Sequence, residues 1–314
     1  MKVVALAGGI GAGKFLRGLV RAIGERDVTV VVNTGDDIEM HGLRVSPDLD
    51  SVTYWLAGEM DRERGWGRRG ESFRATGELA GFDPNAAWFN LGDLDLATHL
   101  FRTRLLAEGV PLSEATRRIA TRFGVRSRVL PMSDDRVTTR IVVEDDGGEL
   151  DLHFQEYWVR RGARDRVVRI VFEGAGRAVP APALVEALDE ADAVVVCPSN
   201  PVVSIGPVLS VPGIREAVAA KRPAVVGVSP IVAGAPLGGM ADKVMPPVGL
   251  EVSALGAAQA YRSILGSWVI DTADVELAPK IEEALAVRVA VTDTLMRDDD
   301  TAEALARVAL STLG

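Results

Sequence analysis

Two short acidic segments near the start of the chain carry side chains that could bind a divalent cation. They are Asn33-Thr34-Gly35-Asp36-Asp37 and Ser46-Pro47-Asp48-Leu49-Asp50. Carboxylate oxygens suit Mg²⁺, which usually takes one or two of them and completes its shell with water and substrate phosphates. Turn formation and helix capping would also explain aspartates at such positions. The spacing alone does not show which carboxylates point inward.

A glycine-rich turn precedes these acids and could hold a phosphate. The segment Gly8-Gly9-Ile10-Gly11-Ala12-Gly13-Lys14-Phe15 matches the first part of a P-loop, but Phe15 stands where a P-loop needs Ser or Thr. The dinucleotide fingerprint GxGxxG also fails, because Lys14 occupies the position of the third glycine. A tight strand-to-helix turn remains the alternative to a phosphate cradle. The candidate nucleotide-binding residues here are Gly9, Gly11, Gly13 and Lys14.

Three later segments supply further candidates. Ser199 and Asn200 lie in a proline-stiffened loop after an apolar run, and their neutral donors and acceptors suit a base or a phosphate. His99 ends the segment 90–99, where a hydrogen-bonded structural histidine is the alternative. Trp158 belongs to the aromatic segment 153–159, which could stack on a planar ring or simply fill the core.

The elements that must position these residues follow an α/β pattern. An apolar run at 2–7, the glycine turn, a helical periodicity and a second apolar run at 28–32 predict a βαβ unit. Strand and helix patterns alternate again from residue 183. We therefore expect a Rossmann-like α/β fold, with a mostly parallel sheet and flanking helices. Its core would comprise residues 1–34 and 176–314.

Residues 35–175 are predicted to form an inserted α+β subdomain that binds substrate. Helices are expected at 50–56, 71–80, 95–107 and 113–123, and strands at 126–130, 136–144, 149–157 and 167–172. Asp146-Gly147-Gly148 is a typical hairpin turn between two of these strands.

Composition excludes several other classes of protein. The 314 residues include 44 acidic and 35 basic side chains, and the net charge of −9 argues against a nucleic-acid partner. The single cysteine, Cys197, rules out an internal disulfide. The apolar opening segment is too short for a signal peptide or a membrane span. These features favour a cytoplasmic protein without a membrane partner.

Taken in order, the motifs resemble the 2-phospho-L-lactate transferase family of coenzyme F420 biosynthesis. The similar stretches, spread over nearly the whole chain, are GGIGAGKFLRGL at 8–19, NTGDD at 33–37, SPDLD at 46–50, RGWG at 64–67, LGDLDLATH at 91–99, MSDD at 132–135, HFQEYWV at 153–159, PSNPVVSIGP at 198–207 and SPIVAGAPLGGMADK at 229–243. Each motif is weak alone, but NTGDD, HFQEYWV and PSNPVVSIGP in this order are specific.

The resemblance implies a transferase of the 2-phospho-L-lactate or phosphoenolpyruvate type. The ribityl hydroxyl of the deazaflavin Fo would attack a guanosine-diphosphate ester of a lactyl, enolpyruvyl or glyceryl acid. GMP would leave, giving F420-0 or its dehydro form, with Mg²⁺ as cofactor. The resemblance also implies a homodimer.

The resemblance further implies roles for individual residues. Asp36 and Asp50 would be catalytic and metal-binding, and Asp37 and Asp48 are the alternative candidates for these roles. Asp50, His99 and Trp158 would bind Fo, while Ser199 and Asn200 would contact the guanine nucleotide. Many members carry arginine within this stretch, where this chain has Leu94 and Leu96. If that arginine holds Fo in relatives, either Arg102 or Arg104 would replace it here or the contact would be missing.

Two other functions remain open at this stage. The glycine turn could serve an NAD-dependent dehydrogenase, although Asn33 stands where an acid for the ribose is expected. A non-catalytic YvcK-like regulator that binds a nucleotide sugar would share the glycine turn but would need no deazaflavin pocket. The aromatic segment 153–159 favours the enzyme over this regulator.

Overall fold

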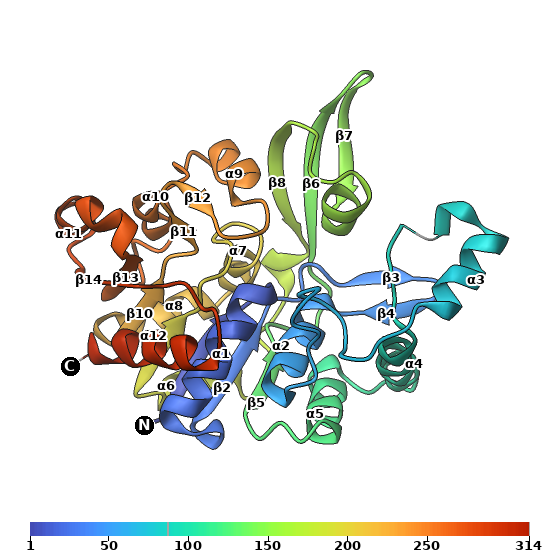
Figure 1. The fold of residues 1–314 in the computed structure, drawn as a ribbon, viewed down its shortest axis with the longest axis horizontal. Coiled ribbons are helices and arrows are strands. Elements are labelled where there is room, and N and C mark those ends of the chain that lie inside the picture. The colour runs from blue at the N-terminus through green and yellow to red at the C-terminus, as the bar shows by residue number, and fades with distance from the viewer. Residues whose placement is uncertain (87, 314) are drawn as a thin grey trace.

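The computed structural model describes residues 1–86 and 88–313, and it has the predicted Rossmann-like α/β fold (Figure 1). Its centre is a seven-stranded sheet in the order β14-β13-β10-β9-β1-β2-β5, and every neighbouring pair is parallel. The strands are β1 (Val3–Ala7), β2 (Val28–Val32), β5 (Arg128–Pro131), β9 (Ala193–Val196), β10 (Val225–Val228), β13 (Ser267–Asp271) and β14 (Arg288–Thr292).

Helices cover both faces of this sheet. One buried cluster joins alternate residues of β1 to α1, α2 and α12, and a second joins the remaining residues to α6, α8, α10 and α11. The helices are α1 (Gly9–Ile23), α2 (Pro47–Ala57), α3 (Arg74–Phe82), α4 (Asp93–Ala107), α5 (Leu112–Arg122), α6 (Leu184–Glu190), α7 (Ile205–Ser210), α8 (Ile214–Ala220), α9 (Ala241–Val244), α10 (Ala254–Gln259), α11 (Ala278–Leu285) and α12 (Asp299–Ser311). Burial on both faces explains why the strands read as continuous apolar runs.

Three smaller sheets complete the architecture. β6 (Thr138–Asp145) lies between β7 (Gly148–His153) and β8 (Val167–Glu173) in an antiparallel sheet that projects beyond the core (Figure 1). β3 (Ile38–Met40) pairs with β4 (Leu43–Val45), and β11 (Ile231–Val232) pairs with β12 (Ala235–Pro236). Short 3-10 turns occur at Glu25–Asp27, Pro84–Ala86, Ala175–Arg177, Arg222–Ala224, Pro246–Val248 and Thr272–Leu277.

The order of the main sheet determines where a ligand can bind. From β1 the chain adds β2 and β5 on one side and then β9, β10, β13 and β14 on the other. The strand order therefore reverses between β1 and β9. In open α/β sheets such a switch point leaves a crevice beyond the carboxyl ends of the strands.

Several predicted elements differ from the observed ones. The strand expected at 149–157 ends at His153, because His153 and Glu156 bind backbone N–H groups and turn the chain into a π-helix, Glu156–Arg160. The hairpin β3–β4 and the helix α7 were not predicted. Strand β5 lies within the expected insertion 35–175 and yet pairs with β2 of the main sheet.

Within the described part of the chain, the helices are too short or too polar to cross a lipid bilayer.

Candidate active site

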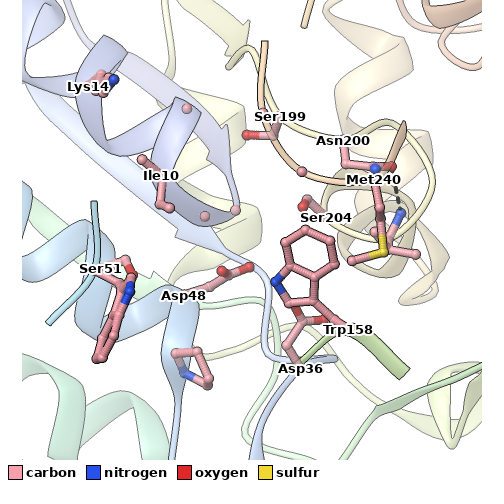
Figure 2. Close-up of a pocket in the computed structure, with 18 of the residues that line it drawn as sticks. Ile10, Lys14, Asp36, Asp48, Ser51, Trp158, Ser199, Asn200, Ser204 and Met240 are labelled. Atoms are coloured by element: carbon pink, nitrogen blue, oxygen red, sulfur yellow. Dashed lines mark hydrogen bonds between the residues drawn. The ribbon is translucent and has the colours of Figure 1, made fainter. Parts of the chain in front are cut away.

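A cavity of about 850 Å³ opens at the switch point of the sheet. Its walls come from the loops that follow β1, β9, β10 and β14, and from α2, α4 and the π-helix. Figure 2 shows the start of α1, the acidic residues Asp36 and Asp48, and Trp158 facing one another across it. The topology therefore brings most of the predicted site residues to one place.

The start of α1 lies against this cavity without a side-chain cap. Gly8 is extended, and no acidic residue stands in the first turn. The Gly9 N–H interacts with Asp48, and the backbone N–H groups that follow it are available to an anion. A Cβ on Gly11 would lie 2.4 Å from the carbonyl oxygen of Pro198, which explains why glycine is required for this close approach. Gly9, Gly11 and Lys14 line the cavity.

Gly13 is the one predicted nucleotide-binding glycine that faces elsewhere. A Cβ there would lie 2.1 Å from Cδ1 of Trp55, so this glycine allows α1 to pack closely against α2. Packing therefore accounts for Gly13 without any ligand.

The loop after β9 brings Ser199 and Asn200 next to the start of α1. The Ser199 hydroxyl is buried and has no hydrogen-bond partner. The Asn200 side-chain oxygen accepts from the backbone N–H groups of Val202 and Val203, at 2.9 and 3.2 Å. A buried hydroxyl without a partner costs free energy, and a ligand that bonds to it would remove that cost.

Asp36 and Asp48 approach each other from the loop after β2 and the first turn of α2. Burial raises the pKa of Asp36 well above its usual range, and the negative charge of Asp48 raises it further. Burial also raises the pKa of Asp48 to about 6, although the Asn33 amide and the Gly9 N–H counteract this rise. Asn33 donates to Asp48 over 2.9 Å, while Asp36 Oδ1 is buried without a partner.

This pair of carboxylates fits a divalent cation. Two neighbouring buried acids whose pKa values are raised gain from a nearby positive charge, which favours their ionised forms. Among the described residues, no three His, Cys, Asp or Glu side chains gather into a complete metal site. A cation here would therefore take its other ligands from water and substrate oxygens, as Mg²⁺ commonly does.

Asp50 lines the same cavity but is already engaged by Arg102. Arg102 Nη1 donates to Asp50 Oδ2 over 3.0 Å, and Nη2 donates to Oδ1. Both side chains are buried. Asp37, the other alternative candidate for metal binding, accepts a hydrogen bond from the Ser46 hydroxyl over 2.6 Å. Burial raises the pKa of Asp37 to about 7.

The Arg102 pair belongs to a larger buried network on α4. His99 Nδ1 lies 3.6 Å from Asp50 Oδ2, and burial lowers the pKa of His99 to about 4, so its ring is neutral at pH 7. His99 Nε2 is buried without a hydrogen-bond partner. Asp95 accepts from the Tyr54 hydroxyl over 2.6 Å, and burial raises the pKa of Asp95 to about 7.

Sequence reasoning missed the roles of Tyr54, Asp95 and Arg102 in this network. The helical spacing of Asp95, His99 and Arg102 places them on one face of α4. This spacing is the feature of the sequence that could have indicated that they lie together. Neither Arg102 nor the exposed Arg104, which pairs with Glu108, lines the cavity. Neither arginine is therefore placed to take over a contact with Fo from Leu94 and Leu96.

Phe154 and Trp158, on the segment that follows β7, form an aromatic wall of the cavity. Trp158 stands on the π-helix with 37% of its surface exposed, and Phe154, Phe89 and Trp66 also line the cavity. Figure 2 shows the indole of Trp158 lying across the opening between Asp36 and Met240. Planar, partly exposed rings of this kind offer a stacking surface to a planar ligand.

Comparisons with known proteins agree with this arrangement. The family model described as 2-phospho-L-lactate transferase CofD matches residues 3–308. A phosphoenolpyruvate transferase of Streptomyces griseus is 49% identical over 311 residues, covering 99% of this chain and 98% of the relative. A phosphoenolpyruvate transferase of Mycolicibacterium smegmatis is 41% identical over 330 residues, covering 100% and 99%.

A solved structure shares the fold at much lower identity. It is a UPF0052-family protein of Bacillus halodurans, with a TM-score of 0.65 and 17% identity over 98% of each chain. The family model matches almost the whole sequence, and the transferases that resemble this chain have nearly the same length. These two findings establish the family. The chain belongs to the 2-phospho-L-lactate transferase CofD family and is a transferase.

Proposed function

We propose that this protein transfers a phosphoenolpyruvyl group from a guanosine-diphosphate ester to the terminal ribityl hydroxyl of Fo. GMP leaves, and the product is dehydro-F420-0. The family match supports a phospho-acid transfer in coenzyme F420 biosynthesis. The name phosphoenolpyruvate transferase, carried by relatives at 41–49% identity, supports the enolpyruvyl group over the lactyl and glyceryl alternatives.

The observation that carries the proposal is the set of residues that line the cavity at the switch point. It combines an uncapped helix start, a buried pair of carboxylates and an aromatic wall within about 850 Å³. The helix start can bind a diphosphate ester, and the carboxylate pair can bind a divalent cation. The aromatic wall can stack on a tricyclic ring. Neither the dehydrogenase nor the nucleotide-sugar regulator would need all three.

Asp36 and Asp48 are proposed as the cation-side pair. Mg²⁺, when bound, would neutralise diphosphate charge and orient the reacting phosphorus. The unpartnered Oδ1 of Asp36 supports its predicted role as a metal ligand. Asp48 is preferred here to Asp50, because both oxygens of Asp50 already accept from Arg102.

Asp50 is proposed to act on the acceptor side. The ribityl oxygen would form a bond to the phosphorus next to the acid, and the bond from that phosphorus to the bridging oxygen of GMP would break. The hydroxyl proton would pass to a wall carboxylate, for which Asp50 is the candidate. Arg102 holds this carboxylate in one orientation, which supports a role in aligning the hydroxyl.

The remaining residues are proposed to bind the two substrates. The first N–H groups of α1, with Lys14, would contact the diphosphate, and the Ser199 hydroxyl and the Asn200 amide would contact the nucleotide. Trp158 would stack on the deazaflavin. His99, neutral and with a free Nε2, would bond to a polar edge of Fo.

Product mass spectrometry tests this function. Fo and Mg²⁺ are incubated with the protein and, separately, with the enolpyruvyl, lactyl and glyceryl esters of guanosine diphosphate. We expect dehydro-F420-0 and GMP from the enolpyruvyl ester at the highest rate. Failure with all three esters, together with tight binding of a UDP-sugar or of NADH, would overturn the proposal.

Two further properties remain predictions from the family resemblance. We expect the enzyme to work in the cytoplasm and to form a homodimer. Sedimentation analysis of the purified chain would test the second.

A further inference from the structure

His153 joins two parts of the cavity wall that are distant in sequence. It is the last residue of β7, it is 7% exposed, and the aromatic segment with Phe154 and Trp158 follows it directly. Its ring nitrogen Nε2 lies 3.2 Å from the backbone carbonyl oxygen of Asp37. The imidazole therefore bridges the aromatic wall and the loop that carries Asp36.

The hydrogen-bond partners of His153 determine which nitrogen carries the proton. Nδ1 lies 3.1 Å from the backbone nitrogen of Gln155, which can only donate, so Nδ1 must accept. The carbonyl oxygen of Asp37 can only accept, so Nε2 must donate. The neutral ring with its proton on Nε2 satisfies both contacts at once.

The acidic loop has a second attachment to the same antiparallel sheet. The backbone N–H of Thr139 in β6 donates to the carbonyl of Gly35 over 2.7 Å. On the other side of the loop, Asn33 accepts from the Gly35 N–H over 2.8 Å and donates to Asp48 over 2.9 Å. The position of Asp36 thus depends on contacts with both the main sheet and the β6–β7 hairpin.

We infer that His153 is a positioning residue, whose Nε2–H bond to the Asp37 carbonyl holds Asp36 in the orientation that the cation-side pair requires. Thr139 bonds to the loop through its backbone, and its hydroxyl packs against Gly35 without a hydrogen bond, so His153 supplies the side-chain hydrogen bond from the hairpin to this loop. Because His153 also begins the aromatic segment, it fixes the distance between the aromatic wall and the carboxylate pair. The inference depends on the proposed metal-side role of Asp36.

Three substitutions of His153 test this role. His153→Gln keeps an amide N–H that can reach toward the Asp37 carbonyl, His153→Asn keeps only the acceptor for Gln155, and His153→Ala removes both. His41→Gln, at an exposed histidine in the β3–β4 turn, is the matched control. The readout is the Mg²⁺-dependent binding of GDP by calorimetry, alongside the melting temperature without ligand.

We expect His153→Ala and His153→Asn to weaken Mg²⁺-dependent GDP binding by roughly three- to tenfold, the value of one neutral hydrogen bond. His153→Gln should recover most of this loss, and GDP binding without Mg²⁺ should not change. A role in folding alone would instead lower the melting temperature and leave the Mg²⁺ dependence intact. A folded His153→Ala protein with wild-type Mg²⁺ dependence would overturn the inference.

The same experiment separates this inference from the proposed function. A wild-type protein that binds Mg²⁺ and GDP but does not convert Fo would contradict the proposed reaction, while the His153 series would still report on the position of the loop. A wild-type protein that binds GDP without any effect of Mg²⁺ would overturn both.

Discussion

Arg102 binds both carboxylate oxygens of Asp50 in a part of the protein where both side chains are buried. The two residues lie on different helices, α4 and α2, so this ion pair also fixes how these helices meet beside the cavity. A buried charge that loses its partner is strongly destabilising.

Replacement of Arg102 should therefore lower stability far more than replacement of the pair. We expect Arg102→Met to reduce the free energy of unfolding by about 3–5 kcal/mol, and the double variant Asp50→Leu with Arg102→Met to recover part of this loss. Urea unfolding followed by circular dichroism measures both. The exposed pair Glu114–Arg117 is the control, and Arg117→Met should change stability little. Equal losses for the single and double variants would contradict this account of the pair.

Substitutions of the aspartates should separate the two sides of the reaction. Asp36→Asn should lower the rate on the order of 100-fold and weaken the response to Mg²⁺, because it removes an oxygen with no other partner. Asp50→Asn should abolish turnover and leave the Mg²⁺-dependent binding of GDP nearly unchanged, because Arg102 already engages this carboxylate. Initial rates over a Mg²⁺ series test the first variant, and calorimetry of GDP binding with and without Mg²⁺ tests the second. Wild-type turnover by Asp50→Asn would remove Asp50 from the mechanism.

The buried acids should make the metal-free protein less stable as the pH rises. Burial raises the folded-state pKa values of Asp37 and Asp95 to about 7, so the folded state binds protons that the unfolded state has already released. Their stabilising contribution is fully present below the unfolded pKa of 3.8 and is lost as the pH rises through about 7. We expect the free energy of unfolding to fall between pH 6.5 and 8.

This pH window also avoids the opposing effect of histidine. Burial lowers the folded-state pKa values of His99 and His153, which makes stability rise with pH up to about 6.5, the usual value for histidine. Asp95→Asn should reduce the decline in the free energy of unfolding between pH 6.5 and 8. Added Mg²⁺ should stabilise the folded protein more at pH 8 than at pH 6.5, because Mg²⁺ competes with protons for the carboxylates. Urea unfolding at both pH values tests this, and a rise in stability over the window would contradict it.

The buried hydroxyl of Ser199 should contribute to nucleotide binding and not to folding. Ser199→Ala should weaken GDP binding by roughly three- to tenfold, the value of one hydrogen bond, and leave the melting temperature unchanged or slightly higher. Calorimetry with GDP gives the affinity. Ser210→Ala is the control, because the Ser210 hydroxyl bonds to the Pro207 carbonyl away from the cavity. Unchanged GDP affinity in Ser199→Ala would exclude this contact.

Trp158 should be the main aromatic contact of the acceptor. Trp158→Ala should raise the KM for Fo by roughly five- to tenfold, since stacking on an aromatic ring is worth about 1–1.5 kcal/mol beyond the buried area. Phe82→Ala, at an aromatic residue that is 87% exposed and outside the cavity, should leave the KM unchanged. Steady-state kinetics over a range of Fo concentrations compares them, and equal KM values in all three proteins would exclude stacking on Trp158.

Local patterns in the sequence predicted much of the fold. The apolar runs of β1 and β2 and the periodicity of α1 reflect burial that each segment shows by itself, and these predictions are confirmed. The family followed from short motifs along the whole chain, and it is confirmed as well. The candidate residues were also named from sequence, because glycines, acids and aromatics at strand ends are visible without a structure.

The tertiary structure decided which of these residues share an environment. The proposed choice among the four aspartates rests on Arg102, more than 50 residues from Asp50 in sequence, which binds both of its oxygens. It also rests on Asp36 Oδ1, which is buried without a partner. The end of β7 depended in the same way on the bonds of His153 to Gln155 and Asp37. Periodicity reports whether a residue is buried, whereas hydrogen bonding and the desolvation of charges depend on partners that only the folded chain brings together.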